Sequence, residues 1–240
     1  MSTYLELSND LARESGLSGA AASISAVTGQ SGQALRVVEW VAQSYKSIQN
    51  RHPNWRWLRR TFTGTTTTAQ SEYAYTAFTD TTDSATISRF SRWLPYDDSG
   101  YPLFTIYVTA SGVAAQQRMI FLPWDYFLSI YRFGTQTSAA PAHYSVTPAN
   151  KIALGPAPDA TGYTVGGDYQ RSAQTLAADS DVPEMPEDFH DLIVFRALER
   201  YARFSAAPEA LAQAEREGGR LLRALEVNQL PAISFGGPLA

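Results

Sequence analysis

Arginine and tryptophan alternate between positions 51 and 60, and this stretch holds the side chains best suited to contact another molecule. The cluster consists of Arg51, Trp55, Arg56, Trp57, Arg59 and Arg60. Guanidinium groups bind phosphates and indole rings stack on bases, so one interpretation is a contact with nucleic acid, to which His52 would contribute. The other is a junction within the protein, in which the arginines stack on the indoles and pair with carboxylates. We favour the junction, between a helical body and a β domain.

Histidines and acidic residues give only weak signals for metal binding or catalysis. His52, His143 and His190 lie in three different segments without the spacing of metal ligands, and His190 suits the exposed start of a helix. Asp97 and Asp98 are conceivable as a glycosidase pair, but adjacent carboxylates in PYDDSG are typical of a solvated turn. None of these groups predicts a reaction.

The motifs that mark common enzymes are missing from the sequence. There is no Walker loop, GxSxG elbow, dinucleotide fingerprint or HExxH pair, and GYTVGGDY has glycines but no following helix. The lack of cysteine excludes disulfides, thiolate zinc sites and cysteine nucleophiles. We therefore predict no catalytic residue, no cofactor and no metal site, and a protein that is not an enzyme.

The composition is that of a globular protein, with 44% hydrophobic residues in a chain of 240. A formal net charge of -4 argues against nucleic-acid binding by bulk electrostatics. No apolar run approaches the roughly 18–20 residues of a membrane span, and the acidic N-terminal segment is unlike a signal peptide, so we expect no membrane contact. Lys46 and Lys151 are the only lysines among 19 basic residues, and the chain has 13 tyrosines. Arginine and tyrosine are enriched in protein interfaces, although β-rich proteins can also be rich in tyrosine.

A helix over residues 32–51 is the clearest secondary-structure prediction, because its apolar residues have the spacing of one helical face. The stripe comprises Leu35, Val38, Val41, Ala42, Tyr45 and Ile48. Ser31 is suited to cap its first amides, and Pro53 ends it by forcing His52 out of the helical region. Val37 and Trp40 lie outside the stripe, and we predict that they contact another subunit.

Further helices are predicted near both chain ends, and strands between them. Residues 3–15 form the first helix, and residues 187–204 and 208–230 form two more, the last with Gly218 where a partner helix would approach closely. Between residues 61 and 180, short β-branched and aromatic segments predict antiparallel strands, interrupted by a short helix at 124–133. One of these segments, FTIYV, is apolar on both sets of alternating positions, as in a strand buried on both faces.

The expected fold class is α+β, a helical bundle built from the N- and C-terminal helices with an inserted antiparallel β-sandwich-like domain. Residues 1–60 and 181–230 would form the helical body, residues 61–180 the β domain, and residues 231–240 a flexible tail. The stripe of the helix at 32–51 would pack against the helix at 187–204.

Three stretches together resemble the head-to-tail adaptor proteins of tailed bacteriophages. They are SGQALRVVEWVAQSYKSIQNRHPNWRWL, KIALGPAPD and YQRSAQTLAADSDVPEMPEDFHDLIVFRALERYARFSAAPEAL. The resemblance covers most of the chain in the same order, and its specificity lies in the combination, especially residues 50–58 and 186–202. It implies a helical body made from both chain ends, an inserted β domain and no catalytic residues.

The resemblance further implies a structural protein of the virion neck, assembled in the host cytoplasm. Copies would form a homo-oligomeric ring of twelve that docks on the portal protein, attaches downstream tail or nozzle proteins, and leaves a channel for DNA in passage. We expect the contacts with other copies or the portal to involve Val37, Trp40, Leu230, Ile233, Phe235 and Leu239.

Two other functions fit the sequence less well. A ligand- or carbohydrate-binding β module of a phage tail is suggested by Tyr73, Tyr75, Tyr96 and Tyr101, but such a module would not need helices at both termini. A virion hydrolase would need an acid, base or nucleophile constellation, and the sequence offers none.

Overall fold

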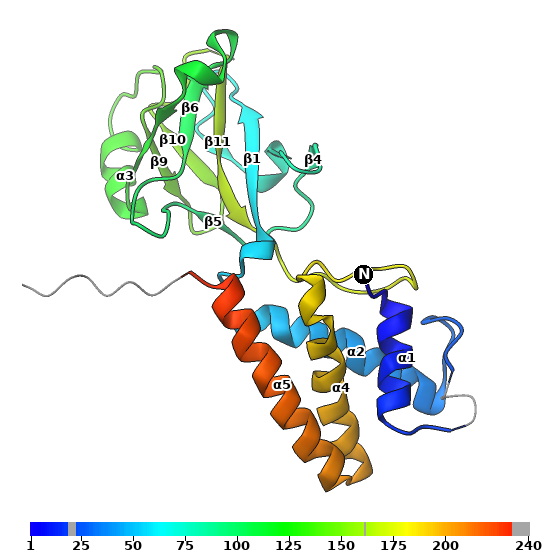
Figure 1. The fold of residues 1–240 in the computed structure, drawn as a ribbon. Coiled ribbons are helices and arrows are strands. Elements are labelled where there is room, and N and C mark those ends of the chain that lie inside the picture. Colours follow the sequence, from blue (N-terminus) through cyan, green and yellow to red (C-terminus); the bar gives the residue numbers. More distant parts are fainter. Residues whose placement is uncertain (19–22, 161, 232–240) are drawn as a thin grey trace, which may run out of the picture. The chain divides into compact units, whose positions relative to one another are not determined.

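The computed structural model describes residues 1–18, 23–160 and 162–231. The chain divides into two compact units, one from Met1–Leu58 together with the chain from Ala173 on, and one from Arg59–Ser172 (Figure 1). We call them the helical unit and the β unit. The boundaries fall at Leu58 and Ser172, where the sequence suggested 60 and 180.

Helices from both chain ends form the helical unit. They are α1 (Tyr4–Glu14), α2 (Gly32–Arg51), α4 (His190–Ser205) and α5 (Pro208–Gln229), with short 3₁₀ turns η2 (Arg56–Leu58) and η6 (Glu187–Phe189). Thr3 and Glu6 close a reciprocal capping box at the start of α1. The predicted cap of α2 is wrong in detail, because the Ser31 side chain makes no hydrogen bond to the described backbone of that helix.

α4 is the central helix of this unit and packs against α1, α2 and α5. In Figure 1, α1 and α5 lie on either side of it. The aliphatic core between the helices includes Val38, Val41, Ile48, Ile193 and Leu198. The face of α2 that points into this core is therefore mostly the predicted stripe, and it meets α4 as expected.

Two residues of α2 differ from the prediction. Leu35 is 38% exposed, and Val37 is 1% exposed within the core of its own unit. A side chain buried in this way is not available to another subunit, so the assignment of Val37 as a subunit contact is wrong. Trp40, the other candidate, is only partly buried.

In the β unit, the described residues form eleven short strands and one α-helix. They are β1 (Arg59–Thr65), β2 (Glu72–Tyr73), β3 (Thr79–Asp80), β4 (Ala85–Thr86), β5 (Arg92–Leu94), β6 (Thr105–Val108), β7 (Gln117–Arg118), β8 (Ile120–Phe121), α3 (Trp124–Tyr131), β9 (His143–Val146), β10 (Ile152–Gly155) and β11 (Tyr163–Gln170). The 3₁₀ turns are η3 (Tyr75–Ala77), η4 (Thr109–Ser111) and η5 (Val113–Ala115). The chain thus has the predicted α+β class.

The strands form two sheets. The 7-stranded sheet has the order β4-β3-β1-β11-β6-β7, with β5 also paired to β11, and the 4-stranded sheet has the order β2-β10-β9-β8. All pairs in the larger sheet are antiparallel, but β8 and β9 are parallel, so the smaller sheet is mixed. β6 also corrects the reading of FTIYV as buried on both faces, because Thr105 and Tyr107 on one face are only partly buried, and Val108 on the other is 47% exposed.

The core of the β unit is largely aromatic. Phe62 lies at its centre and makes edge contacts with Phe78, Trp93 and Phe104, which itself stacks on Tyr144 at 4.4 Å. A buried hydroxyl in such a core needs a partner. The hydroxyl of Tyr144 donates to the Pro95 carbonyl, and that of Tyr169 donates to Asp80 Oδ2 at 2.6 Å.

Candidate interaction surface

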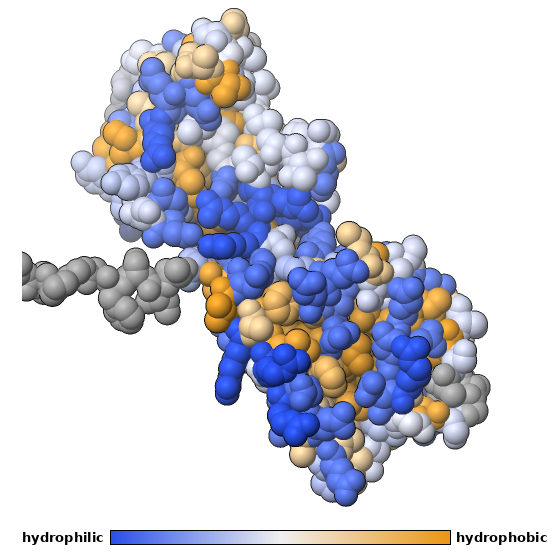
Figure 2. Space-filling view, in the orientation of Figure 1, coloured by the Kyte–Doolittle hydropathy of each residue, from blue (hydrophilic) through white to orange (hydrophobic). Residues whose placement is uncertain are grey.

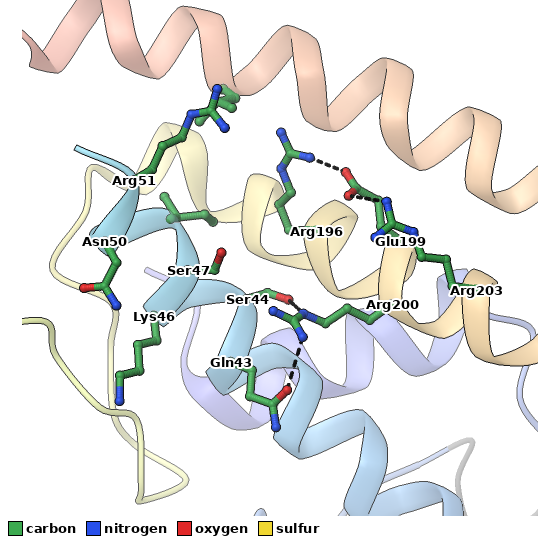
Figure 3. Close-up of a pocket in the computed structure, with 12 residues that line it drawn as sticks. Gln43, Ser44, Lys46, Ser47, Asn50, Arg51, Arg196, Glu199, Arg200 and Arg203 are labelled. Atoms are coloured by element: carbon green, nitrogen blue, oxygen red, sulfur yellow. Dashed lines mark hydrogen bonds and ion pairs between the residues drawn. The ribbon is translucent and has the colours of Figure 1, made fainter.

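A groove of about 790 Å³ lies between α2, α4 and α5 of the helical unit (Figure 3). Its lining comprises Gln43, Ser44, Lys46, Ser47, Ile48, Asn50, Arg51, Arg196, Glu199, Arg200, Arg203 and Leu222. Two polar arcs meet here, one on α2 and one on α4, because the opposite faces of both helices are used by the core. We call this concavity the basic groove.

Glu199 organises the floor of the groove. It is 7% exposed, accepts a hydrogen bond from Arg196 at 2.5 Å, and lies 3.9 Å from Arg203. Arg203 also reaches Glu215 of α5 at 3.5 Å. A buried carboxylate needs such partners to offset its desolvation, so these ion pairs fix α4 against α5.

Two cations of the groove have no carboxylate partner among the described residues. Arg200 donates to the neutral oxygens of Ser44 at 3.2 Å and Gln43 at 3.3 Å. Lys46 is exposed, and its side chain points away from α4 in Figure 3. The groove therefore keeps positive charge that its own unit does not neutralise.

An exposed aromatic cluster lies one helical turn from the groove. Trp40 contacts Tyr201 and Phe204, with ring centroids 6.1 and 5.7 Å apart. Phe204 is 55% exposed, and the Arg36 guanidinium lies 4.4 Å over its ring. Trp40 precedes Gln43 by one turn of α2, and Phe204 follows Arg200 by one turn of α4. We call these four residues the aromatic ledge.

The predicted arginine–tryptophan cluster begins at the C-terminal end of α2. Trp55 is fully buried, donates to the carbonyls of Ile48 and Gln49 at 3.1 Å, and stacks on Trp57 at 4.4 Å. These contacts tie the segment after α2 to the last turn of that helix.

Glu226 of α5 binds the basic residues at the same end of α2. Arg51 and His52 meet its Oε1 at 3.0 and 2.9 Å. Desolvation raises the pKa of Glu226, but the hydrogen bonds from His52 and Arg51 outweigh it, and the net pKa is lowered. This part of the cluster belongs to the packing of the helical unit.

The second half of the cluster belongs to the β unit. Arg59 pairs with Asp168 of β11 at 2.7 Å, and Arg60 lies on β1 close enough to Asp80 to lower the pKa of that carboxyl. Arg56 is exposed. The boundary between the units falls at Leu58, inside the cluster, so the structure does not gather these residues in one patch within a unit.

The three histidines are not brought together. His143 Nδ1 lies 2.7 Å from the hydroxyl of Tyr131, and His52 pairs with Glu226. His190 is buried, with Nε2 at 3.1 Å from the Met185 carbonyl, so its prediction as an exposed residue is wrong. Within residues 1–18, 23–160 and 162–231, no three metal-ligating side chains converge on one point.

The carboxylate pair in PYDDSG forms a turn. Asp97 Oδ1 accepts from the amides of Ser99 and Tyr101, both at 2.9 Å. Asp98 is exposed beside it. This is the solvated turn that the sequence indicated.

The four tyrosines of the carbohydrate hypothesis have different environments. Tyr73 is 3% exposed and bonded to the backbone of Thr67, and Tyr75 stacks on Phe90. Tyr96 and Tyr101 are 43% and 60% exposed. Two of the four are thus occupied by packing, which removes much of the support for a sugar-stacking platform.

The β unit exposes more large hydrophobic residues than the helical unit. They are Tyr96, Tyr101, Val108, Val113, Ile120, Tyr126, Ile130 and Phe133. On the face shown in Figure 2, hydrophobic residues of both units appear as separate patches between hydrophilic ones. Large exposed apolar side chains that gather on a surface suit contacts with other proteins.

Comparison with known proteins identifies the family. The sequence profile of the SU10 adaptor protein family matches residues 2–238. The chain belongs to this family. Its members are phage adaptor proteins, structural rather than enzymatic, so the chain is a virion component that interacts with other phage head and tail proteins. A search of curated proteins finds no match to the chain. Among the described residues of this adaptor, no helix has the length and apolar character to cross a bilayer.

The basic groove was not predicted as a site, although its signal is in the sequence. Arg196, Arg200 and Arg203 follow the spacing of one helical face, and Lys46 lies on the polar arc of α2. What the sequence does not show is that these arcs face one another. Of the remaining interface candidates, Leu230 is partly buried against the core of the helical unit. Ile233, Phe235 and Leu239 lie outside the described residues.

Proposed function

We propose that this adaptor forms a ring on the portal and attaches the tail to it. The ring would hold twelve copies, matching the portal, with a central channel through which DNA passes. Downstream tail or nozzle proteins would bind the opposite side of the ring. Assembly would take place in the host cytoplasm, before the virion is complete.

The observation that carries this proposal is the match to an adaptor family over nearly the whole chain. The fold adds physical support. The helical unit has uncompensated charge on one face and an exposed aromatic ledge, and the β unit has many exposed large hydrophobic residues. Such surfaces suit a subunit that must contact other proteins on several sides.

The proposal is tested by mixing the purified chain with portal rings of the same phage. Native mass spectrometry should give a complex in which the number of added copies equals the number of portal subunits. Electron microscopy should show a second ring stacked on the portal with an open channel. A chain that leaves the mass of the portal unchanged, or that binds immobilised glycans instead, would contradict the proposal.

The aromatic ledge and Leu230 are the contacts to test within this function. Trp40→Ala should weaken ring formation on the portal, because aromatic anchors supply much of the binding energy at interfaces. Val37→Ala is the control, since it changes the core of the unit and not its surface. If the Trp40→Ala variant forms rings and unfolds as the wild type does, Trp40 is not part of the interface.

A further inference from the structure

We propose that the basic groove of one copy receives an acidic face on α1 and the start of α4 of the next copy, and that this is the side-by-side contact of the ring. The acidic face consists of Glu6, Asp10, Glu14 and Asp191. The inference rests on the proposed function, because it assumes that copies form a ring. A closed ring of more than two identical subunits needs two different, complementary surfaces on every copy.

The acidic face concentrates negative charge on one side of the helical unit. Burial raises the pKa of Asp10, Arg13 lowers it, and the nearby carboxylates of Asp191 and Glu6 raise it further, so that the net pKa is raised. Glu6 and Asp10, together with Arg13, border a shallow hollow of about 430 Å³ at the start of α1. Glu14 and Asp191 are exposed and make no ion pair with any described residue. Asp10 is paired with Arg13, so the charges that this surface leaves without an ion pair among the described residues are those of Glu14 and Asp191.

The basic groove has the opposite character. Five of its lining residues are cationic and one, Glu199, is anionic. Of these five cations, Lys46 and Arg200 have no carboxylate partner among the described residues. The charges that one face lacks are therefore those that the other face presents, which is the complementarity that directs protein association.

The two faces cannot satisfy each other within one copy. The basic groove lies between α2, α4 and α5, whereas the acidic face lies on α1 and the first turn of α4. In Figure 1, α1 and α5 are on either side of α4. A second copy can bring its acidic face to the groove, and repetition of this contact is heterologous, as a ring requires.

The aromatic ledge beside the groove would supply the apolar part of the contact. Phe204 and Trp40 are the kind of side chains that act as anchors in interfaces, and Arg36 already covers one ring face. Charge would then set which faces meet, and the ledge would add affinity.

Nucleic acid is the rival occupant of a basic groove, and the structure favours it less. Three of the five cations already face carboxylates, Arg196 and Arg203 at Glu199, and Arg51 at Glu226. Carboxylates this close would repel the phosphate backbone that supplies most nucleic-acid affinity. An acidic protein face can instead place single carboxylates beside the free cations.

The experiment reverses charge on each face of the full chain and then on both. The groove variant is Lys46→Glu with Arg200→Glu, and the acidic-face variant is Glu14→Lys with Asp191→Lys. The control reverses two exposed arginines of α5 that are outside the groove lining, Arg216→Glu with Arg223→Glu. Circular dichroism and thermal unfolding establish that each variant is folded, and ring formation on portal rings is measured by native mass spectrometry.

Each single-face variant should form rings at least about 100-fold less well than the wild type, since like charges facing across an interface are strongly unfavourable. The chain with all four reversals should regain ring formation, because its faces are again opposite in charge. The control should assemble as the wild type does. If the chain with all four reversals regains ring formation, the loss of ring formation in the single-face variants is not caused by misfolding.

Four results would overturn the inference. If both single-face variants form rings as well as the wild type does, the groove and the acidic face are not the contact between copies, although the proposed adaptor function still holds. Failure of the four-fold variant to recover, although folded, would show that the two faces do not meet each other. Loss of binding to a DNA duplex in the groove variant, with ring formation unchanged, would assign the groove to nucleic acid. If the wild type itself forms no ring on the portal, the proposed function fails together with this inference.

Discussion

The helical unit and the β unit differ in the residues that form their hydrophobic cores and in those they expose. The helical unit has a largely aliphatic core, in which Val41, Ile193 and Leu198 are almost fully buried, and charged side chains line its groove. The β unit is built around stacked and edge-on aromatic rings, such as Phe62 and Phe104, and its exposed residues include many large hydrophobic ones. One unit is thus suited to contacts selected by charge, and the other to contacts driven by apolar burial.

The largest expected effect comes from Trp55, one of the few fully buried aromatic residues in the largely aliphatic core of the helical unit. Trp55→Ala should lower the free energy of unfolding by about 3–5 kcal/mol, because it opens a cavity and leaves the carbonyls of Ile48 and Gln49 without their indole donor. Urea unfolding followed by circular dichroism measures the change. Trp55→Phe, which keeps most of the volume, should lose much less. Equal losses in the two variants would show that the hydrogen bonds, and not the volume, hold this segment.

The second-largest effect is expected in the β unit, where an added methyl group would press on the aromatic core. A Cβ at Gly167 of β11 would lie 2.5 Å from the ring of Phe104, which is itself held against Tyr144. Gly167→Ala should therefore destabilise the chain by about 3 kcal/mol through overpacking. Thermal unfolding measures this, with Gly219→Ala as the control, because a Cβ there meets no described atom. A tolerated Gly167→Ala would mean that the aromatic core can shift more freely than its stacking indicates.

A buried polar pair gives the third effect, and it depends on pH. Burial raises the pKa of Asp80, but the hydrogen bonds from Tyr169 and from the amides of Thr82 and Asp83 outweigh it, and the net pKa lies below its ordinary value of 3.8. The ionised carboxylate of Asp80 therefore stabilises the fold fully at pH values above 3.8. This stabilisation is lost as the pH falls from 3.8 through the lower pKa of the folded state.

Replacing the carboxylate tests this directly. Asp80→Asn should cost roughly 1.5–2 kcal/mol at neutral pH, since it removes a charge-assisted hydrogen bond, and should flatten the loss of stability in acid. Unfolding in urea at a series of pH values between neutrality and acid measures both. Tyr169→Phe removes the same bond from the other side, so the two changes together should cost less than their sum. An unchanged acid profile in Asp80→Asn would contradict the assignment.

The smallest effect is a gain in the helical unit. A Cβ at Gly218 of α5 would make ordinary contacts, 3.4 Å from Glu199 and 3.5 Å from Phe195. Gly218→Ala should raise stability by about 0.5–1 kcal/mol, because alanine suits a helix interior better than glycine. A destabilised variant would show instead that α4 and α5 are packed too tightly for a methyl group, as the sequence suggested for this glycine.

The helices could be predicted from the sequence far better than the sites. The range of α2 matches the prediction at both ends, because hydrophobic spacing and Pro53 are local signals. The environments of Leu35 and Val37 were not predictable in this way, since they depend on which neighbours cover each side of a wide apolar arc.

The β unit and the groove depend even more on contacts between distant residues. β8 pairs parallel to β9 across a helix, and no local pattern near Ile120 or His143 shows that. The two polar arcs of α2 and α4 were visible separately, at Lys46 and at Arg200. Their convergence into one groove follows from the packing of α4 between its neighbours, which only the folded chain shows.

The proposed contact between the basic groove and the acidic face can be measured directly, because the sequence contains no cysteine. A chain with Lys46→Cys and Glu14→Cys is assembled on portal rings, treated with a flexible bifunctional maleimide, and run on a denaturing gel. We expect a ladder of covalent multimers that requires the portal, and no ladder for a chain with Arg216→Cys and Glu14→Cys. Rings visible by electron microscopy whose Lys46→Cys, Glu14→Cys chains all remain monomeric on the gel would contradict the proposed contact.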